Sequence, residues 1–248
     1  NWNARCNCEM SISLSMPIYR LNEELWFPPP SEFEDDIVAV GGDITPQRVL
    51  LAVHSGIFPW YSEPNEPMWY CPLERCVFPI QSFRVAKSVI QTARKMKWTV
   101  TFDQVFHEVI QLCSTWKREG ETWIFPEIKE AYGELYELGF AHSVEVWQEN
   151  ELVGGLYGTS LGKMFSGESM FSKEPNASKF ALACLIYHLK KNDFLLLDAQ
   201  VENEHLMSLG AQLIVRDVYL ERLKDAQTFP TNRGKWTFEL NQFSELRS

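Results

Sequence analysis

The chain has 248 residues, of which 45% are hydrophobic and 13% aromatic, so it can bury a full core in one large domain or in one large and one small domain. It contains no run of about 18 apolar residues, which argues against a transmembrane helix, and its net charge of −10 argues against a general nucleic-acid binder. Its six cysteines include no Cys-x-x-Cys pair and its histidines are scattered, so we expect reduced thiols, no metal site and no cofactor.

The first part of the chain predicts a small structural unit built around one helix. Residues 1–15 show no clear periodicity, and the segment MPIYRLNEELWF begins afresh at Met16, so we expect residues 1–15 to be an upstream remnant outside the fold. The segment AVGGDITPQRVLLAVHSGIF predicts a Gly-Gly turn and a short helix. Asp43 or Thr45 is suited to cap this helix, and Gly56 stands just past its end.

A segment without acidic residues runs from Arg75 to Phe102 and carries six basic residues. Its apolar spacing predicts a helix over residues 84–97. Four polar side chains share one face of that helix: Arg84, Lys87, Gln91 and Arg94. In an otherwise acidic chain this face is either a binding site for an anion or an ordinary solvated helix face.

Two further helices are predicted beyond this segment. The residues WTVTF predict a strand over residues 98–102, and Asp103 is positioned to cap a following helix that runs through Cys113. Another helix is predicted over residues 126–138, where it stops at Gly139.

The remaining elements predict an α+β fold rather than a doubly wound sheet. Three alternating runs separated by short turns indicate an antiparallel meander: residues 142–148, 152–160 and 163–171. A helix over residues 176–191 then leads to a strand over residues 194–201. We expect a small N-terminal domain over residues 16–73 and a catalytic domain over residues 74–248.

A polar pair interrupts the last predicted strand, FLLLDAQV. Asp198 and Gln200 stand two residues apart, so alternation would point both side chains to one face. A buried carboxylate is unfavourable unless it is paired or hydrogen-bonded. Glu168 lies in another apolar run, FSGESMFS, beside Gly167, whose missing side chain leaves room for a close approach. Glu168 is either a residue of the solvated sheet face or a partner of the polar pair.

Aromatic residues gather in a proline-rich region, where they either form the core of the small domain or offer a platform for stacking bases. These residues are Trp60, Tyr61, Trp69 and Tyr70. Trp123 lies in a loop just before a helix, where a core role is harder to assign.

Two other patterns are typical of structural positions. The stripe Leu182, Leu185 and Leu189 has the spacing of a buried helix face. His142 and His205 have no cysteine or serine arrangement that would suggest a nucleophile, so we expect both to be hydrogen-bonded structural histidines.

Six segments together resemble the leucyl/phenylalanyl-tRNA–protein transferase family, in that family's order over roughly residues 26 to 222: AVGGDITPQRVLLAVHSGIFPWYS, ETWIFPE, AHSVEVWQENELVGGLYG, FSGESMFS, NASKFALACL and LLLDAQVENEHLMSLGA. The resemblance implies a small N-terminal domain joined to a GCN5-related acyltransferase-like domain, with a mostly antiparallel central sheet flanked by helices. It also implies a bacterial cytoplasmic enzyme. Such an enzyme moves Leu, Phe or Met from aminoacyl-tRNA to an N-terminal Lys or Arg, which marks the acceptor protein for N-end-rule degradation.

The same resemblance implies roles for individual residues. The reaction pair is Asp198 and Gln200, with Glu168 and Asn203 beside it, and adenosine stacks on Trp60 and Trp123. The amino-acid pocket is formed by seven apolar residues: Leu156, Phe165, Met170, Leu182, Leu185, Leu189 and Leu197. The family's basic helix matches through Lys87 and Arg94. Together with Arg84 and Lys95 of the segment without acidic residues, they form the expected tRNA-binding face. We expect a monomer that binds no membrane.

The chain departs from the family pattern at a few positions. Ala199 stands where the family often has Cys, Leu185 and Leu189 stand where it often has aromatic residues, and Gln91 replaces a frequent base. These departures affect the ranking of Leu, Phe and Met rather than the chemistry.

The expected chemistry needs orientation more than a strong base. The Gln200 side-chain carbonyl accepts a hydrogen bond from the attacking amine, and we expect Asp198 to fix the orientation of the Gln200 amide. Glu168 either attracts the positive side chain of the acceptor or helps to position the ester, and the sequence does not separate these roles.

Two competing interpretations belong to other classes of protein. A CoA-dependent N-acetyltransferase would cradle pyrophosphate in a glycine-rich loop, and the corresponding segment MFSKEPNASK contains no glycine. A non-catalytic RNA-binding module would account for the basic helix and the aromatic residues, but it leaves Asp198, Gln200 and Glu168 unexplained.

Overall fold

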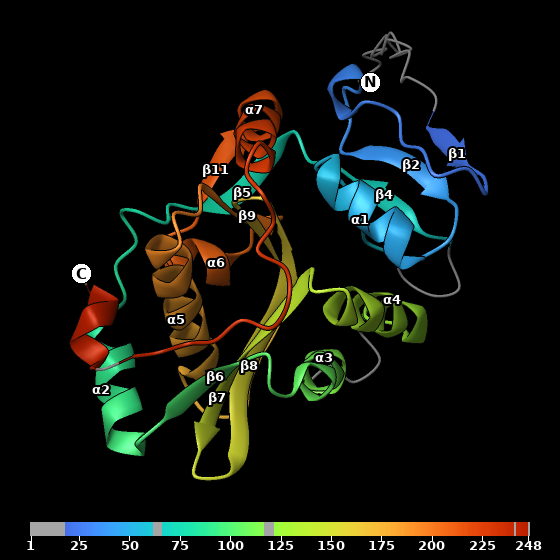
Figure 1. Cartoon of the computed structure of the whole chain (residues 1–248). Helices are drawn as coiled ribbons and strands as arrows, with labels where there is room; N and C mark the ends of the chain where they lie inside the picture. The colour runs from blue at the N-terminus through green and yellow to red at the C-terminus, as the bar shows by residue number, and fades with distance from the viewer. Residues whose placement is uncertain (1–17, 62–65, 117–121, 241, 248) are drawn as a thin grey trace, which may run out of the picture.

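Two β-sheets organise the chain in a computed structural model that describes residues 18–61, 66–116, 122–240 and 242–247. The described residues form a four-stranded sheet in the order β1-β2-β4-β3 and a seven-stranded sheet in the order β11-β5-β10-β9-β8-β7-β6. Figure 1 shows the small sheet with α1 beside the large one, joined by the chain that leads into β5. The expectation that residues 1–15 lie outside the fold falls outside the described residues.

The small sheet and its helices occupy the first part of the chain. Strand β1 runs parallel to β2, and the other pairs are antiparallel. The elements are β1 (Tyr19–Leu21), the 3-10 helix η1 (Pro30–Glu32), β2 (Ile37–Gly41), α1 (Pro46–His54), β3 (Phe58–Pro59) and β4 (Met68–Tyr70).

The large sheet is antiparallel except for the pair β9 and β10. Its strands are β5 (Glu74–Phe78), β6 (Thr99–Phe102), β7 (Ala141–Gln148), β8 (Glu151–Leu161), β9 (Met164–Ser172), β10 (Leu196–Gln200) and β11 (Gln212–Val215). The helices are α2 (Lys87–Met96), α3 (Phe106–Thr115), α4 (Pro126–Glu137), α5 (Ala177–Lys191), α6 (Glu204–Ser208) and α7 (Arg216–Gln227), and the 3-10 helix η2 covers Phe243–Arg247. The predicted α+β class, with a mostly antiparallel sheet flanked by helices, is confirmed.

Helices cover both faces of the large sheet (Figure 1). Helices α2 and α5 enclose one hydrophobic core, and α3 and α4 enclose another on the opposite face. Glycines let α5 lie close to β8, because a Cβ at Gly154 would stand 2.5 Å from the Cβ of Ala177. No helix in the described ranges combines the length and apolar character needed to span a bilayer.

Helix α1 forms as its capping residues predict. Pro46 occupies the first turn, and the Thr45 Oγ1 accepts a hydrogen bond from the Arg48 backbone N–H at 3.3 Å. Gly56 follows the helix with φ +76°, and a Cβ there would stand 2.9 Å from side-chain atoms of Tyr219 and Leu220. Gly56 is therefore required both by its backbone and by the packing of α7.

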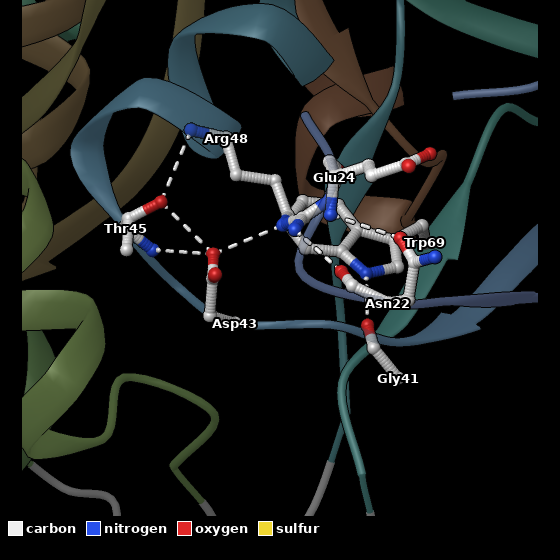
Figure 2. A network of polar contacts seen from close by, with 7 residues as sticks. All are labelled: Asn22, Glu24, Gly41, Asp43, Thr45, Arg48 and Trp69. Carbon is white, nitrogen blue, oxygen red and sulfur yellow. Dashed lines mark hydrogen bonds and ion pairs between the residues drawn. The ribbon is translucent and has the colours of Figure 1, made fainter. Parts of the chain in front are cut away.

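A buried arginine of α1 fixes the chain segment that follows β1 (Figure 2). Arg48 is 0% exposed, and its Nε donates to the Asp43 Oδ1 at 2.9 Å. Its Nη1 and Nη2 donate to the backbone carbonyls of Glu24 at 3.1 Å and Asn22 at 2.8 Å. A side chain of α1 thus fixes the chain next to β1, because a buried guanidinium must satisfy its donors within the protein.

A second buried arginine ties the small sheet to the large one. Arg216, at the start of α7, donates through Nη1 to the carbonyls of Pro30 at 3.0 Å and Phe33 at 2.6 Å. Its Nη2 donates to the carbonyl of Asp35, and its Nε donates to that of Pro72 at 3.4 Å. These bonds place the first unit against the strands that carry the candidate site.

The structure corrects two local expectations. Helix α2 begins at Lys87 rather than at residue 84, since Ala86 is its N-cap with extended backbone and Arg84 lies outside the helix. Asp103 does not cap α3, whose N-cap is Val105. Asp103 is instead buried with φ +57°, and its carboxylate accepts hydrogen bonds from the backbone N–H groups of Ser143 at 2.7 Å and Trp236 at 2.7 Å.

We predict that Arg48→Met lowers the free energy of unfolding by about 3 kcal/mol, because it leaves buried carbonyl groups without donors. Urea denaturation followed by the intrinsic tryptophan fluorescence of the chain measures this loss. The control is Arg20→Met, which removes an exposed ion pair with Glu66 and should change stability by no more than about 0.5 kcal/mol. Equal effects of the two substitutions would contradict a structural role for the hydrogen bonds of Arg48.

Candidate active site

A cavity of about 700 Å³ opens where the first unit meets the large sheet. Its size falls within the range of about 300–1,000 Å³ that is typical of small-molecule sites. Residues from β3, β8, β9, α5, β10 and α6 form its wall. The three predicted catalytic residues, Glu168, Asp198 and Gln200, line it together.

The backbone of β10 bulges at the predicted polar pair. Asp198 stands opposite Val77 of β5, and Gln200 stands opposite the adjacent Cys76. Strand β10 therefore advances by two residues where β5 advances by one, and the extra residue, Ala199, makes a β-bulge. Gln200 has φ +63°, which is uncommon for a residue other than glycine. Its backbone N–H donates to the Asp198 Oδ1 at 2.8 Å. The bulge, rather than simple alternation, sets the direction of the Gln200 side chain.

Asp198 is paired with Arg75 in the interior. The Arg75 Nε donates to Oδ1 at 2.8 Å and its Nη2 donates to Oδ2 at 2.6 Å, while the Tyr219 hydroxyl donates to Oδ2 at 3.0 Å. Both charged side chains are about 1% exposed. The guanidinium lies between two rings, 4.7 Å from the centroid of Phe58 and 4.4 Å from that of Tyr219.

Arg75 was not predicted as a residue of the site. In the sequence Arg75 belongs to the basic segment, whereas in the structure its side chain is buried and pairs with Asp198 of the cavity wall. A usable signal was its position in the otherwise apolar strand RCVF, because an arginine there needs a buried acid. Tyr219 and Ser166 were also missed, and neither had a distinguishing pattern.

Glu168, not Asp198, fixes the orientation of the Gln200 side chain, which corrects the expected mechanism. The Gln200 Nε2 donates to the Glu168 Oε2 at 2.9 Å and lies 3.4 Å from the Ser166 Oγ. Since the amide nitrogen is held there, the carbonyl Oε1 is left for another partner. Asp198 acts on the backbone N–H of Gln200 instead.

The environment of Glu168 disfavours its charge. Burial raises the pKa of Glu168 to about 7, although the hydrogen bond from Gln200 acts in the opposite direction. The buried phenol of Tyr132 also interacts with this carboxyl group, and burial raises the pKa of Tyr132. At Gly167 a Cβ would meet only the Asp198 carbonyl at 3.5 Å, so no side chain presses on this backbone.

Five of the seven predicted pocket residues line the cavity: Leu156, Met170, Leu182, Leu185 and Leu197. Phe165 and Leu189 do not line it. Both are 0% exposed and belong to the hydrophobic core behind the wall. The structure therefore gathers an apolar slot without these two residues.

The aromatic residues divide between core and cavity. Trp69 and Tyr61 are buried, whereas Trp60 is 46% exposed and lines the cavity together with Trp123. Asn203 also lines the cavity, and its Oδ1 accepts from the Leu206 N–H at 2.8 Å as the cap of α6. Among the described residues its Nδ2 has no hydrogen-bond partner.

The four predicted tRNA-binding residues are exposed: Arg84, Lys87, Arg94 and Lys95. Lys87 and Arg94 share a face of α2 with Gln91. The helix lies beside the start of α5, where the Asn176 Nδ2 donates to the Thr92 Oγ1 at 3.2 Å. Since Ser178 and Leu182 of α5 line the cavity, the basic helix flanks the helix that forms one wall.

The histidines have separate positions. The His142 Nδ1 lies 2.8 Å from the Asp103 Oδ2, which confirms the expected structural role. His205 lines the mouth of the cavity, and its exposed ring has no hydrogen bond among the described residues, so the expected pairing is wrong. Among the residues that the structure describes, no group of three or more acidic, histidine or cysteine side chains is arranged to hold a metal ion.

We predict that Arg75→Met lowers the free energy of unfolding by about 3–5 kcal/mol, because it strands a buried carboxylate. Adding Asp198→Asn to the same chain should recover part of that loss, since no uncompensated charge then remains. Urea denaturation of Arg75→Met, of Asp198→Asn and of the double variant measures the difference. Destabilisation of the double variant by the sum of the two single losses would show that the groups are not coupled.

Comparison with known proteins assigns the chain to a family. The model for the leucyl/phenylalanyl-tRNA protein transferase matches residues 77–224, and the model for the N-terminal domain of that transferase matches residues 42–73. The leucyl/phenylalanyl-tRNA–protein transferase of Desulfatibacillum aliphaticivorans is 46% identical over 227 residues, which cover 90% of this chain and 97% of that protein. That of Maridesulfovibrio salexigens is 47% identical over 235 residues, which cover 93% of this chain and 98% of that protein.

Among solved structures, the structure of L-PGS from Bacillus licheniformis is similar over 68% of this chain and 60% of that chain. The TM-score is 0.36 and the sequence identity is 15%. The two transferases show the family of this chain, because they align with about nine-tenths of it. The chain belongs to the leucyl/phenylalanyl-tRNA–protein transferase family and is an aminoacyltransferase.

Proposed function

We propose that this bacterial cytoplasmic protein transfers leucine, phenylalanine or methionine from aminoacyl-tRNA to proteins that begin with lysine or arginine. The product then carries a destabilising N-terminus that marks it for N-end-rule degradation. The observation that carries the proposal is the meeting of an apolar slot with Glu168 and Gln200 in one cavity of a chain from this family. The direct test is transfer of labelled leucine from charged tRNA to a peptide that begins with arginine.

The apolar slot accounts for the class of amino acid. Its leucine and methionine side chains offer no polar partner, which suits leucine, phenylalanine and methionine. A single methyl group in such a pocket changes binding by only about 1–3 kcal/mol. Discrimination against valine and isoleucine therefore rests on a clash of their branched Cβ near the ester.

The aromatic residues account for the end of the tRNA. Exposed Trp60 and the half-buried Trp123 line the same cavity and offer faces on which an unpaired adenine stacks. Stacking of one base on an aromatic side chain contributes about 1–3 kcal/mol. The ester then lies between this platform and the apolar slot.

The transfer step joins the acceptor amine to the ester carbonyl. The amine nitrogen forms the new bond, the ester C–O bond to the terminal ribose breaks, and the amine proton passes to the departing ribose oxygen. An α-amino group has a pKa of about 7.7–8.0, so part of it is already a free nucleophile at neutral pH. The Gln200 Oε1 orients this amine, Glu168 holds the Gln200 amide, and Asp198 holds its backbone.

We predict that Gln200→Ala and Asp198→Ala each reduce transfer at least about tenfold, which corresponds to about 1.4 kcal/mol of transition-state stabilisation. The double variant should be little worse than the more damaged single variant, because Asp198 acts through the position of Gln200. Initial rates with labelled leucyl-tRNA and an arginyl peptide measure these effects. The control is Gln81→Ala, an exposed glutamine that does not line the cavity. Full activity of folded Gln200→Ala would remove this pair from the reaction.

A further prediction concerns the basic helix α2. If the basic side chains of α2 bind tRNA phosphates, the double substitution Lys87→Gln and Arg94→Gln weakens the affinity equally for all tRNA sequences. The slope of log affinity against log salt concentration also becomes shallower. The slope changes by about 0.9 for each duplex phosphate that the protein no longer neutralises. Transfer from an aminoacylated adenosine should not change, because this donor lacks the tRNA body.

The matched control replaces two exposed basic residues of α7, Arg222→Gln and Lys224→Gln, in one chain. This helix lies on another side of the molecule from α2 in Figure 1. Filter binding or fluorescence anisotropy across a salt series compares the variants. An unchanged slope for the α2 variant would favour the alternative of an ordinary solvated helix face.

A further inference from the structure

The charges that line the cavity do not balance. Its described wall contains three carboxylates, those of Glu168, Asp198 and Glu202, and it contains no lysine or arginine. A cavity lined by one sign of charge attracts ligands of the other sign. The question is which of these carboxylates is available to a cation.

Two of the three are already engaged. Both oxygens of Asp198 accept hydrogen bonds from the buried guanidinium of Arg75, so its charge is compensated inside the protein. The Glu168 Oε2 accepts from the Gln200 amide at 2.9 Å, and burial disfavours the charged form of this group. Asp198 cannot take a second cation without breaking a hydrogen bond that holds the site. The Glu168 Oε1 accepts no hydrogen bond among the described residues, but it is buried near the Tyr132 phenol, and burial favours the neutral form of this carboxyl group over a partner for a cation.

Glu202 differs from both. It is exposed, and it forms no ion pair with any described residue. Burial raises the pKa of the Cys76 thiol to about 11 and the carboxylates of Asp198 and Glu202 add to this effect. Because Cys76 stands opposite Gln200 in the sheet, the Glu202 carboxylate lies close to the bulge of β10.

Chain geometry gives the reach. Glu202 follows Gln200 by two residues, and two residues of extended chain span at most about 7 Å. An acceptor whose α-amine meets the Gln200 Oε1 therefore has Glu202 within the range of a long side chain. Lysine and arginine carry their charge at the end of such a flexible apolar stem.

We propose that Glu202 is a specificity-determining residue that binds the positive side chain of the acceptor's N-terminal lysine or arginine. This inference rests on the proposed function and adds the residue that selects the acceptor. Glu202 takes no part in bond formation, so its contribution lies in acceptor binding. Because it is exposed, its attraction weakens as salt rises.

The experiment compares peptides that are identical except for an N-terminal arginine, lysine or citrulline. Citrulline keeps the shape of arginine without its charge. For Glu202→Gln we expect the ratio of kcat/KM for arginine over citrulline to fall at least about fivefold, through a higher KM for the basic peptides. The kcat, the KM for aminoacyl-tRNA and the use of the citrulline peptide should stay as in the wild type. The charge reversal Glu202→Lys should lower the ratio further.

The control is Glu204→Gln, which removes an equally charged, exposed side chain two residues away that does not line the cavity. Thermal melting of each variant confirms that it is folded. If the wild type prefers the basic peptides and Glu202→Gln keeps that preference, the inference fails while the proposed function stands. If Glu204→Gln loses the preference equally, assignment to Glu202 is wrong. If the wild type shows no preference for basic peptides, the proposed acceptor class itself fails.

Discussion

The buried ion pair between Arg75 and Asp198 is the constraint on which the geometry of the candidate site depends. It joins β5 to β10 just where β10 bulges, and the Asp198 Oδ1 that accepts from the Arg75 Nε also accepts from the backbone N–H of Gln200. Desolvating two charges is unfavourable unless their geometry is good. Here the bidentate contact, the Tyr219 hydroxyl and the two flanking rings supply that compensation. A left-handed backbone at Gln200 persists because its surroundings determine it.

Local signals were enough to predict several helices. The cap at Thr45 and the glycine at position 56 bound α1, and Pro126 and Gly139 bound α4, because capping chemistry is written within a few residues. The position of β5 between β10 and β11 was not predictable in the same way. Its pairing joins residues more than a hundred positions apart, and no local pattern encodes such a partner.

The candidate site shows the same limit in its side chains. Asp198, Gln200 and Glu168 stood out because polar groups in apolar runs require partners. Arg75 did not stand out, since an arginine in a basic segment resembles a surface residue until its acid is known. Apolar positions are less informative still, because Leu185 of the cavity wall and Leu189 of the core share one helix stripe.

The placement of charge suits a reaction that is already downhill. In the proposed transfer, an activated ester and a partly deprotonated amine need alignment rather than a strong base, and the neutral amide of Gln200 would provide an acceptor whose protonation does not change near neutral pH. Buried charges then serve to hold that amide: Arg75 and Asp198 act on its backbone, and Glu168 acts on its nitrogen. Arg216 extends the same principle, because it anchors the unit that carries Trp60 against the strands that carry Gln200. The two substrates can be aligned only while these distant segments keep their relative position.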